Sequence, residues 1–145
     1  MPMQVLSSAI EALNDGRVSV TISDANAPDM PLVYVSPGFT TFSGYKRAEV
    51  LGRNCRFLQR GRTDQPGLVV IRDAIRRKEG CTTELLNFRK DGTELLNRIS
   101  LYPIFATDGS LRYYIGLQSD IGLLAGLRAR LADHFAAKGL ELIEH

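Results

Sequence analysis

The octet GRNCRFLQ, residues 52–59, places one thiol between an amide and a guanidinium. The neighbouring Arg56 favours the thiolate form of Cys55, whereas the apolar Phe57 that follows favours the neutral thiol. Cys55 and Gln59 are four residues apart, so a helix would project both from one face and aim a thiol and an amide together. A purely structural cysteine needs none of these neighbours. The stretch therefore indicates a thiol held beside a polar partner.

Two further amides lie in consecutive segments that alternate as strands do. If the turn between them comprises residues 91–93, Asn87 lies directly opposite Asn97 on the same face of a sheet. A two-residue turn at 91–92 would instead pair Asn87 with Leu96 and put the two amides on different faces. The choice of turn thus decides whether the amides act together.

The next hairpin adds a third amide. A two-residue turn at 108–109 sets Gln118 opposite Ile99, diagonal to Asn97 and on the same face. A buried face with three amides must satisfy many donors and acceptors, because each unpaired buried group costs about 1–3 kcal/mol. A planar ligand with alternating carbonyl and N–H groups would satisfy them, and so would solvent on an exposed face. The amides alone favour neither possibility.

The composition limits the classes of function. The chain has 145 residues, 44% hydrophobic and 23% charged, as expected of one globular domain with a real core. A net charge of +2 without a basic block argues against nucleic acid as a partner. No apolar run is long enough to span a membrane, and the N-terminus lacks the positive n-region and apolar core that are typical of a signal peptide. Two cysteines and two histidines suit neither a disulfide framework nor a metal site, so we expect a reducing cytoplasm.

The strands that position these side chains follow from alternation and turn residues. The first strand places Thr21 and Ser23 on one face and Val20 and Ile22 on the other. Together with three hairpin-linked strands near the C-terminus it predicts an α+β domain with an antiparallel sheet. Strands are expected at residues 17–23, 32–36, 82–88, 94–102 and 111–119.

Helices are predicted at both ends of the chain and between the second and third strands. An N-terminal helix is expected within 1–16, the core within 17–120, and a C-terminal helix within 121–145. Short helices are expected around KRAEVL and NCRFLQ, and a longer one is expected after a cap at Thr63 or Asp64. The apolar stripe of that longer helix comprises Leu68, Ile71 and Ile75, and the stripe of the C-terminal helix comprises Leu124, Leu127, Leu131 and Phe135.

The octet, with LLNFRKDG, an asparagine in the following strand and YYIGLQSDI, resembles the light-oxygen-voltage (LOV) family of blue-light receptors, a branch of the PAS fold. The resemblance covers about residues 17–120 in order, and the octet matches the family signature at every position. It implies a five-stranded antiparallel sheet with helices over one face and flanking terminal helices. It also implies a blue-light sensing flavoprotein that is not an enzyme.

The resemblance assigns a role to each matching residue. Cys55 corresponds to the residue that forms a reversible covalent bond with the excited flavin, and Gln118 to the amide that faces the neighbouring ring nitrogen and relays the signal. Arg56 and Arg72 correspond to the phosphate clamp. The loop RGRTD is too short for the insertion seen in FAD-binding relatives, which favours FMN. The other cofactor-binding positions, expected from the resemblance or from their place on the same face, are Thr21, Ser23, Asn54, Leu58, Gln59, Asn87, Asn97, Leu101 and Tyr114.

Several positions depart from the family pattern. Met30 stands where a polar residue close to the ring edge is common, and Tyr114 where phenylalanine is usual. Thr63 and Leu68 fall where some short bacterial members carry further phosphate-binding arginines. Arg60 and Arg62 are interpreted as solvated loop charges, although both could reach the phosphate.

Output and partners follow from the terminal helices. An apolar stripe without an effector domain to cover it leads us to expect a homodimer through the terminal helices and an unidentified downstream protein. Two other hypotheses remain at this point. One is a PAS-type binding or redox-sensing module with a different ligand. The other is a thiol enzyme using Cys55, although no histidine or second cysteine lies near it in the sequence.

Overall fold

The computed structural model describes residues 4, 6, 8, 10–11 and 18–143, without the side chains of residues 124 and 125. Five strands form one sheet in the order β2-β1-β5-β4-β3, and every neighbouring pair is antiparallel. This confirms the α+β class and the five-stranded antiparallel sheet. The strands are β1 (Ser19–Asp24), β2 (Leu32–Val35), β3 (Cys81–Phe88), β4 (Glu94–Phe105) and β5 (Leu111–Asp120).

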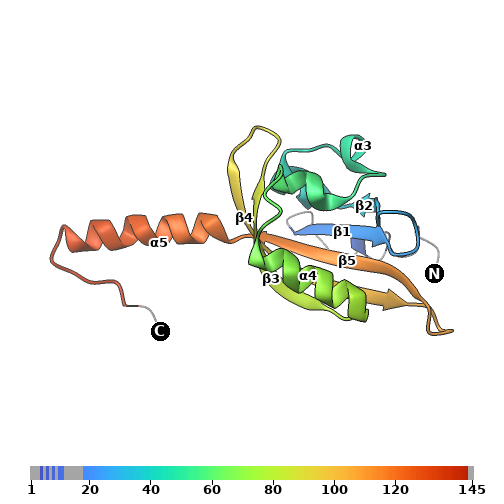
Figure 1. The fold of residues 1–145 in the computed structure, drawn as a ribbon. Coiled ribbons are helices and arrows are strands. Elements are labelled where there is room, and N and C mark those ends of the chain that lie inside the picture. The colour runs from blue at the N-terminus through green and yellow to red at the C-terminus, as the bar shows by residue number, and fades with distance from the viewer. Residues whose placement is uncertain (1–3, 5, 7, 9, 12–17, 144–145) are drawn as a thin grey trace.

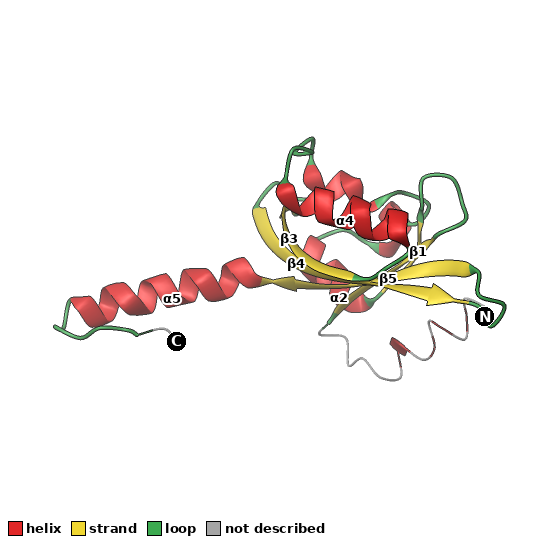
Figure 2. Cartoon of the chain, turned by 60° about the horizontal axis from the view of Figure 1, so that its bottom comes forward, coloured by secondary structure: helices red, strands yellow, loops and turns green. Residues whose placement is uncertain are grey.

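The helices between β2 and β3 pack on one face of this sheet, and Figure 2 shows α4 lying across it. The segment comprises α2 (Pro37–Ser43), α3 (Arg47–Val50), the 3₁₀ helix η1 (Cys55–Gln59) and α4 (Pro66–Arg77). The sequence did not predict α2. The expected cap of α4 was also wrong: the cap is Gln65, because Pro66 takes the first helical position, which its fixed φ and missing N–H suit.

The terminal helices are described to different extents. Residues 4, 6, 8, 10 and 11 are helical, and the rest of the predicted helix at 1–16 lies outside the described residues. Helix α5 (Ile121–Ala136) begins where it was expected and extends away from the sheet (Figure 1). Asp120 caps it by accepting a 3.3 Å hydrogen bond from the Leu123 N–H, and its second oxygen pairs with Arg89. Within the described part of the chain, no helix is long and apolar enough to cross a membrane.

The β3–β4 hairpin differs from the predicted register by two residues. Asn87 lies opposite Leu95, not opposite Asn97, and Asn97 lies opposite Leu85. The turn closes one residue earlier than expected, at a 2.9 Å bond from Arg89 N–H to the carbonyl of Thr93. Because side chains alternate with a period of two, an even shift keeps both asparagines on one face.

The β4–β5 hairpin confirms the predicted pairing of Gln118 with Ile99. Its turn is not the expected two-residue turn at 108–109, because Ala106 N–H bonds to the carbonyl of Ser110 and encloses three residues. A β-bulge between Ile104 and Phe105 then restores the predicted register along the rest of the hairpin.

Two glycines bring helices into direct contact with the sheet backbone. A Cβ on Gly38 of α2 would lie 2.2 Å from the carbonyl oxygen of Val18, and one on Gly67 of α4 would lie 2.2 Å from that of Glu84. No other residue fits either approach. The apolar core divides into two clusters, one around Phe39 and Leu58 and the other around Leu68 and Leu85, and members of both line the same cavity.

Candidate functional site

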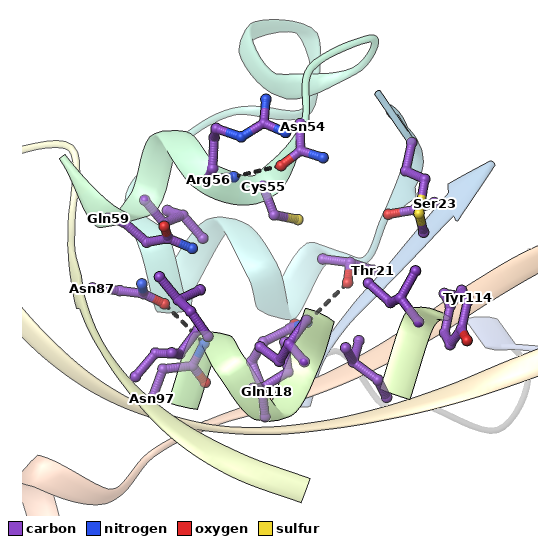
Figure 3. Close-up of a pocket in the computed structure, with 18 of the residues that line it drawn as sticks. Thr21, Ser23, Asn54, Cys55, Arg56, Gln59, Asn87, Asn97, Tyr114 and Gln118 are labelled. Carbon is purple, nitrogen blue, oxygen red and sulfur yellow. Dashed lines mark hydrogen bonds between the residues drawn. The ribbon is translucent and has the colours of Figure 1, made fainter. Parts of the chain in front are cut away.

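One cavity of about 250 Å³ lies between the helices and the covered face of the sheet (Figure 3). Every site residue proposed from the sequence lines it, from segments as far apart as β1 and β5. These residues are Thr21, Ser23, Asn54, Cys55, Arg56, Leu58, Gln59, Arg72, Asn87, Asn97, Leu101, Tyr114 and Gln118.

The sheet forms one wall of the cavity because alternate residues of its strands face the helices. The side chains of Asn87, Asn97 and Gln118 are only 2%, 1% and 6% exposed. The solvent-face interpretation of these amides is therefore wrong. Burial obliges each of them to find hydrogen-bond partners within the protein or on a ligand.

The two asparagines leave one acceptor unsatisfied. Asn97 Nδ2 donates to Asn87 Oδ1 at 3.0 Å, and Asn87 Nδ2 donates to the Leu86 carbonyl at 3.2 Å. Asn97 Oδ1 is buried and has no hydrogen-bond partner among the residues that the structure describes. An N–H donor on a ligand would satisfy it.

Gln118 is held at both ends of its amide by β1. The Ser19 hydroxyl donates to Gln118 Oε1 at 2.6 Å, and Gln118 Nε2 donates to Thr21 Oγ1 at 2.8 Å. A Cβ on Gly116 would lie 2.6 Å from Thr21 Oγ1 and 2.7 Å from Gln118 Nε2, so the glycine makes room for this arrangement. Sequence reasoning missed Ser19, although strand alternation places it on the face of Thr21 and Ser23.

Cys55 begins the 3₁₀ helix, which Asn54 caps by accepting a 2.9 Å bond from the Arg56 N–H (Figure 3). Burial raises the pKa of the Cys55 thiol from 9.0 to about 12. Of the two opposing influences on the thiol, the neighbouring arginine and the apolar surroundings, the apolar surroundings therefore dominate. The thiol is neutral at physiological pH. Gln59, at the other end of η1, lines the same cavity.

The arginines near the cavity have different partners. Arg56 donates two hydrogen bonds to the Asp29 carboxylate, at 2.6 and 2.5 Å, and these bonds hold the pKa of Asp29 below its ordinary value. Arg72 lines the cavity from the exposed side of α4. Arg60 instead donates to the carbonyls of Arg89 and Lys90, at 3.0 and 2.9 Å.

The remaining walls are mostly apolar. Three of the further lining residues, Leu68, Ile71 and Ile75, form the α4 stripe that the sequence predicted, but none of them was proposed as a site residue. Strand alternation places Leu85 on the face of Asn87 and Ile99 on the face of Asn97, and so could have identified both. Phe39 lies in α2, the helix that the sequence did not predict. The further lining residues are Met30, Phe39, Thr63, Leu68, Ile71, Ile75, Leu85 and Ile99.

No metal site accompanies the cavity in the part of the chain that the structure describes. There, no three His, Cys, Asp or Glu side chains come together as metal ligands would. The chemistry available at the cavity is therefore that of amides, hydroxyls, arginines and one neutral thiol.

Comparison with known proteins places this architecture in a family. Residues 17–122 match the model of the PAS domain family. The solved LOV domain of the blue-light activated histidine kinase EL346 from Erythrobacter litoralis is 38% identical, with a TM-score of 0.67, over 72% of this chain and 95% of that one. The chain belongs to the PAS domain family and, within it, to the LOV branch.

Other relatives are longer. A blue-light photoreceptor of Listeria monocytogenes is 39% identical over 77% of this chain and 44% of its own length. The solved structure of an RNA-binding light-oxygen-voltage receptor is 42% identical, with a TM-score of 0.74, over 83% of this chain and 35% of that one. The chain spans less than half the length of the curated relatives that it matches.

Proposed function

We propose that the chain is a blue-light sensing module that binds FMN in this cavity, and that light drives a reversible covalent bond between Cys55 and the flavin ring. The observation that carries the proposal is the buried, unpartnered acceptor of Asn97 beside Asn87. The pyrimidine edge of a flavin presents an N–H flanked by carbonyls, which complements an asparagine pair offering both acceptors and donors.

A bound flavin would supply the absorption of blue light and a ring carbon that accepts sulfur. The Cys55 thiol would give up its S–H bond, supplying its sulfur to that carbon and its proton to the adjacent ring nitrogen. The neutral thiol suits this step because it carries its own proton. The apolar side chains of Leu58 and Leu101, which line the cavity, would wall the flavin ring.

The other residues would hold and orient the flavin. Arg72 and Arg56 offer guanidinium groups to the phosphate, for which arginine is well suited because its fork binds two oxygens at once. Asn54 and Gln59 provide polar contacts from η1. The short loop between η1 and α4 supports FMN over a larger dinucleotide.

Gln118 would pass the change to the rest of the domain. Its amide faces Ser19 and Thr21, whose hydroxyls can each donate or accept. Protonation of the ring nitrogen would favour an inverted amide, and both hydroxyls can reverse their roles to follow it. One proposed route therefore runs along β1 toward the N-terminus, and a second runs along β5 to α5.

The output is proposed to be a change in the terminal helices or in a homodimer that they form, read by a downstream protein. Three leucines of α5 support such an interface: Leu123, Leu127 and Leu131 are 68%, 45% and 39% exposed. The division into flanking segments at 1–16 and 121–145 around a core at 17–120 belongs to this proposal. The proposal also includes a cytoplasmic location for the sensor. It further includes that the sensor has no enzymatic activity of its own.

An absorption spectrum before and after blue light tests the proposal. The purified chain should be yellow, lose its blue absorption on illumination and recover in the dark. Cys55→Ala should keep FMN and its fluorescence without the reversible loss, whereas Cys81→Ala, a matched control, should behave as the parent. A colourless chain favours a different PAS ligand, and a reversible loss that survives in Cys55→Ala overturns the role of this thiol.

A further inference from the structure

Asp29, in the loop between β1 and β2, accepts hydrogen bonds from two residues at the start of η1. Its main-chain carbonyl accepts a 2.6 Å hydrogen bond from Asn54 Nδ2, while its carboxylate receives both bonds of the Arg56 fork. Asn54 and Arg56, which flank Cys55 in the octet, thus both hydrogen-bond to the same loop residue. Met30, the next residue in the loop, lines the cavity, so these hydrogen bonds lie beside a part of the cavity wall.

The backbone at this point is in an unfavourable conformation. Asp29 has φ 68° and Met30 has φ 47°, both in the left-handed region that residues other than glycine rarely adopt. A 3.1 Å bond from Met30 N–H to the Ala27 carbonyl closes the loop internally. The contacts from Asn54 and Arg56 therefore help to maintain a loop that would relax without them.

The Arg56 fork is already filled by a carboxylate. A phosphate presents paired oxygens to a guanidinium much as a carboxylate does, so the two groups compete for the same Nη1 and Nη2 hydrogens. Arg72, the other arginine of the proposed clamp, forms no ion pair with any residue that the structure describes. The two arginines are thus not equivalent before an anionic ligand arrives.

We propose that Asp29 is an internal competitor for Arg56: it occupies the guanidinium fork that the anionic tail of the ligand would take, and so lowers the affinity for phosphorylated ligands relative to neutral ones. Binding of the phosphate transfers Arg56 from Asp29 to the ligand and loosens the hold on the loop that carries Met30. The inference rests on the proposed flavin site and adds a residue that sets its selectivity for the tail.

Riboflavin and FMN test this directly, because they share the ring system and differ by the phosphate. The full chain, freed of flavin, is titrated with each of them, and binding is followed by the quenching of flavin fluorescence. Asp29→Asn should tighten FMN about three- to fivefold, the scale of an exposed ion pair, and leave riboflavin unchanged. Asp73→Asn, which removes an equal charge from a surface pair with Arg76, should change neither affinity.

Two further variants guard against effects of folding. Asp29→Gly removes the carboxylate while suiting the positive φ, and should raise the ratio of FMN to riboflavin affinity in the same way. In an Arg56→Gln background, Asp29→Asn should have no effect on that ratio. A ratio that stays constant or falls in Asp29→Asn overturns the inference alone, whereas a parent chain that binds neither flavin overturns the proposed function as well.

Discussion

Ser19 and Gln118 lie directly opposite each other on β1 and β5, and the Ser19 hydroxyl donates a 2.6 Å hydrogen bond to the Gln118 side-chain oxygen. With Thr21 at the other end of the amide, Gln118 makes both of its side-chain hydrogen bonds among the described residues with β1. Gln118 is therefore connected by the chain through Ser119 and Asp120 to α5, and by buried hydrogen bonds to the start of β1.

Replacing Gln118 by leucine should separate photochemistry from output. Gln118→Leu should keep the reversible bond at Cys55, because the thiol does not depend on the amide, and should lose the light-induced change in α5. Light-minus-dark hydrogen exchange over residues 120–138 checks this in parent and mutant. An unchanged light response in the mutant would show that the signal leaves the flavin by another path.

Removing the Ser19 hydroxyl should affect the same relay from the other side. Ser19→Ala leaves a buried amide oxygen without its donor, which should lower the free energy of unfolding by about 1–3 kcal/mol and change the light response of residues 18–24. The control is Ser119→Ala, because Ser119 is exposed and its hydroxyl makes a long hydrogen bond of 3.4 Å to the Arg98 carbonyl. Equal effects of the two variants would argue against a route through β1.

Gly116→Ala should disrupt the relay sterically. The added Cβ would meet Thr21 Oγ1 and Gln118 Nε2 at 2.6 and 2.7 Å, so the variant should lose about 1–3 kcal/mol in the free energy of unfolding. Gly126→Ala is the matched control in α5, where an added Cβ has no neighbour within 4 Å among the described residues and alanine favours the helix. Urea unfolding measures the change in the free energy of unfolding for each variant. Gly116→Ala should lower this free energy, and Gly126→Ala should raise it.

The raised pKa of Cys55 predicts a dependence of stability on alkaline pH. Below pH 9 the thiol is protonated in the folded and unfolded chains alike, and it contributes no difference. Between pH 9 and its folded pKa of about 12, the unfolded chain loses a proton that the folded chain retains, so stability falls. The expected loss is about 1.4 kcal/mol per pH unit.

Flavin-free parent, Cys55→Ala and Cys81→Ala chains should be compared by urea unfolding between pH 8 and 11. Burial also raises the pKa of Cys81, so Cys81→Ala controls for the second thiol. Stability should fall less steeply with pH in Cys55→Ala than in the parent. Equal slopes in all three chains would contradict the raised pKa of Cys55.

The sequence predicted the register of the β4–β5 hairpin but not that of the β3–β4 hairpin. Asn87 and Asn97 share the covered face, as the three-residue turn would place them on one face, yet they are diagonal neighbours because the turn closes at Arg89 and Thr93. A register error of two residues leaves every side chain on its face, which is why the cavity residues were found despite it. Turn closure depends on local hydrogen bonds that the alternation does not encode.

Contacts between distant segments were beyond the sequence. Asp29 and Arg56 are separated by 27 positions, and only the folded loop brings the carboxylate to the guanidinium. Helix α2 also escaped prediction, because PGFTTFS is short and carries no helical stripe long enough to recognise. The octet was enough to predict the position of the Cys55 thiol, because the residues around it belong to one short element and are neighbours in the sequence.

The glycine contacts of α2 and α4 have a mechanical consequence. Where Gly38 and Gly67 touch the carbonyls of Val18 and Glu84, backbone rests on backbone with no compressible side chain between them. Neither helix can slide along the sheet at these points without a steric clash, so the two contacts behave as fixed pivots. We therefore expect any widening of the cavity to occur on its loop side, where Met30 and η1 lie, and not at these two contacts.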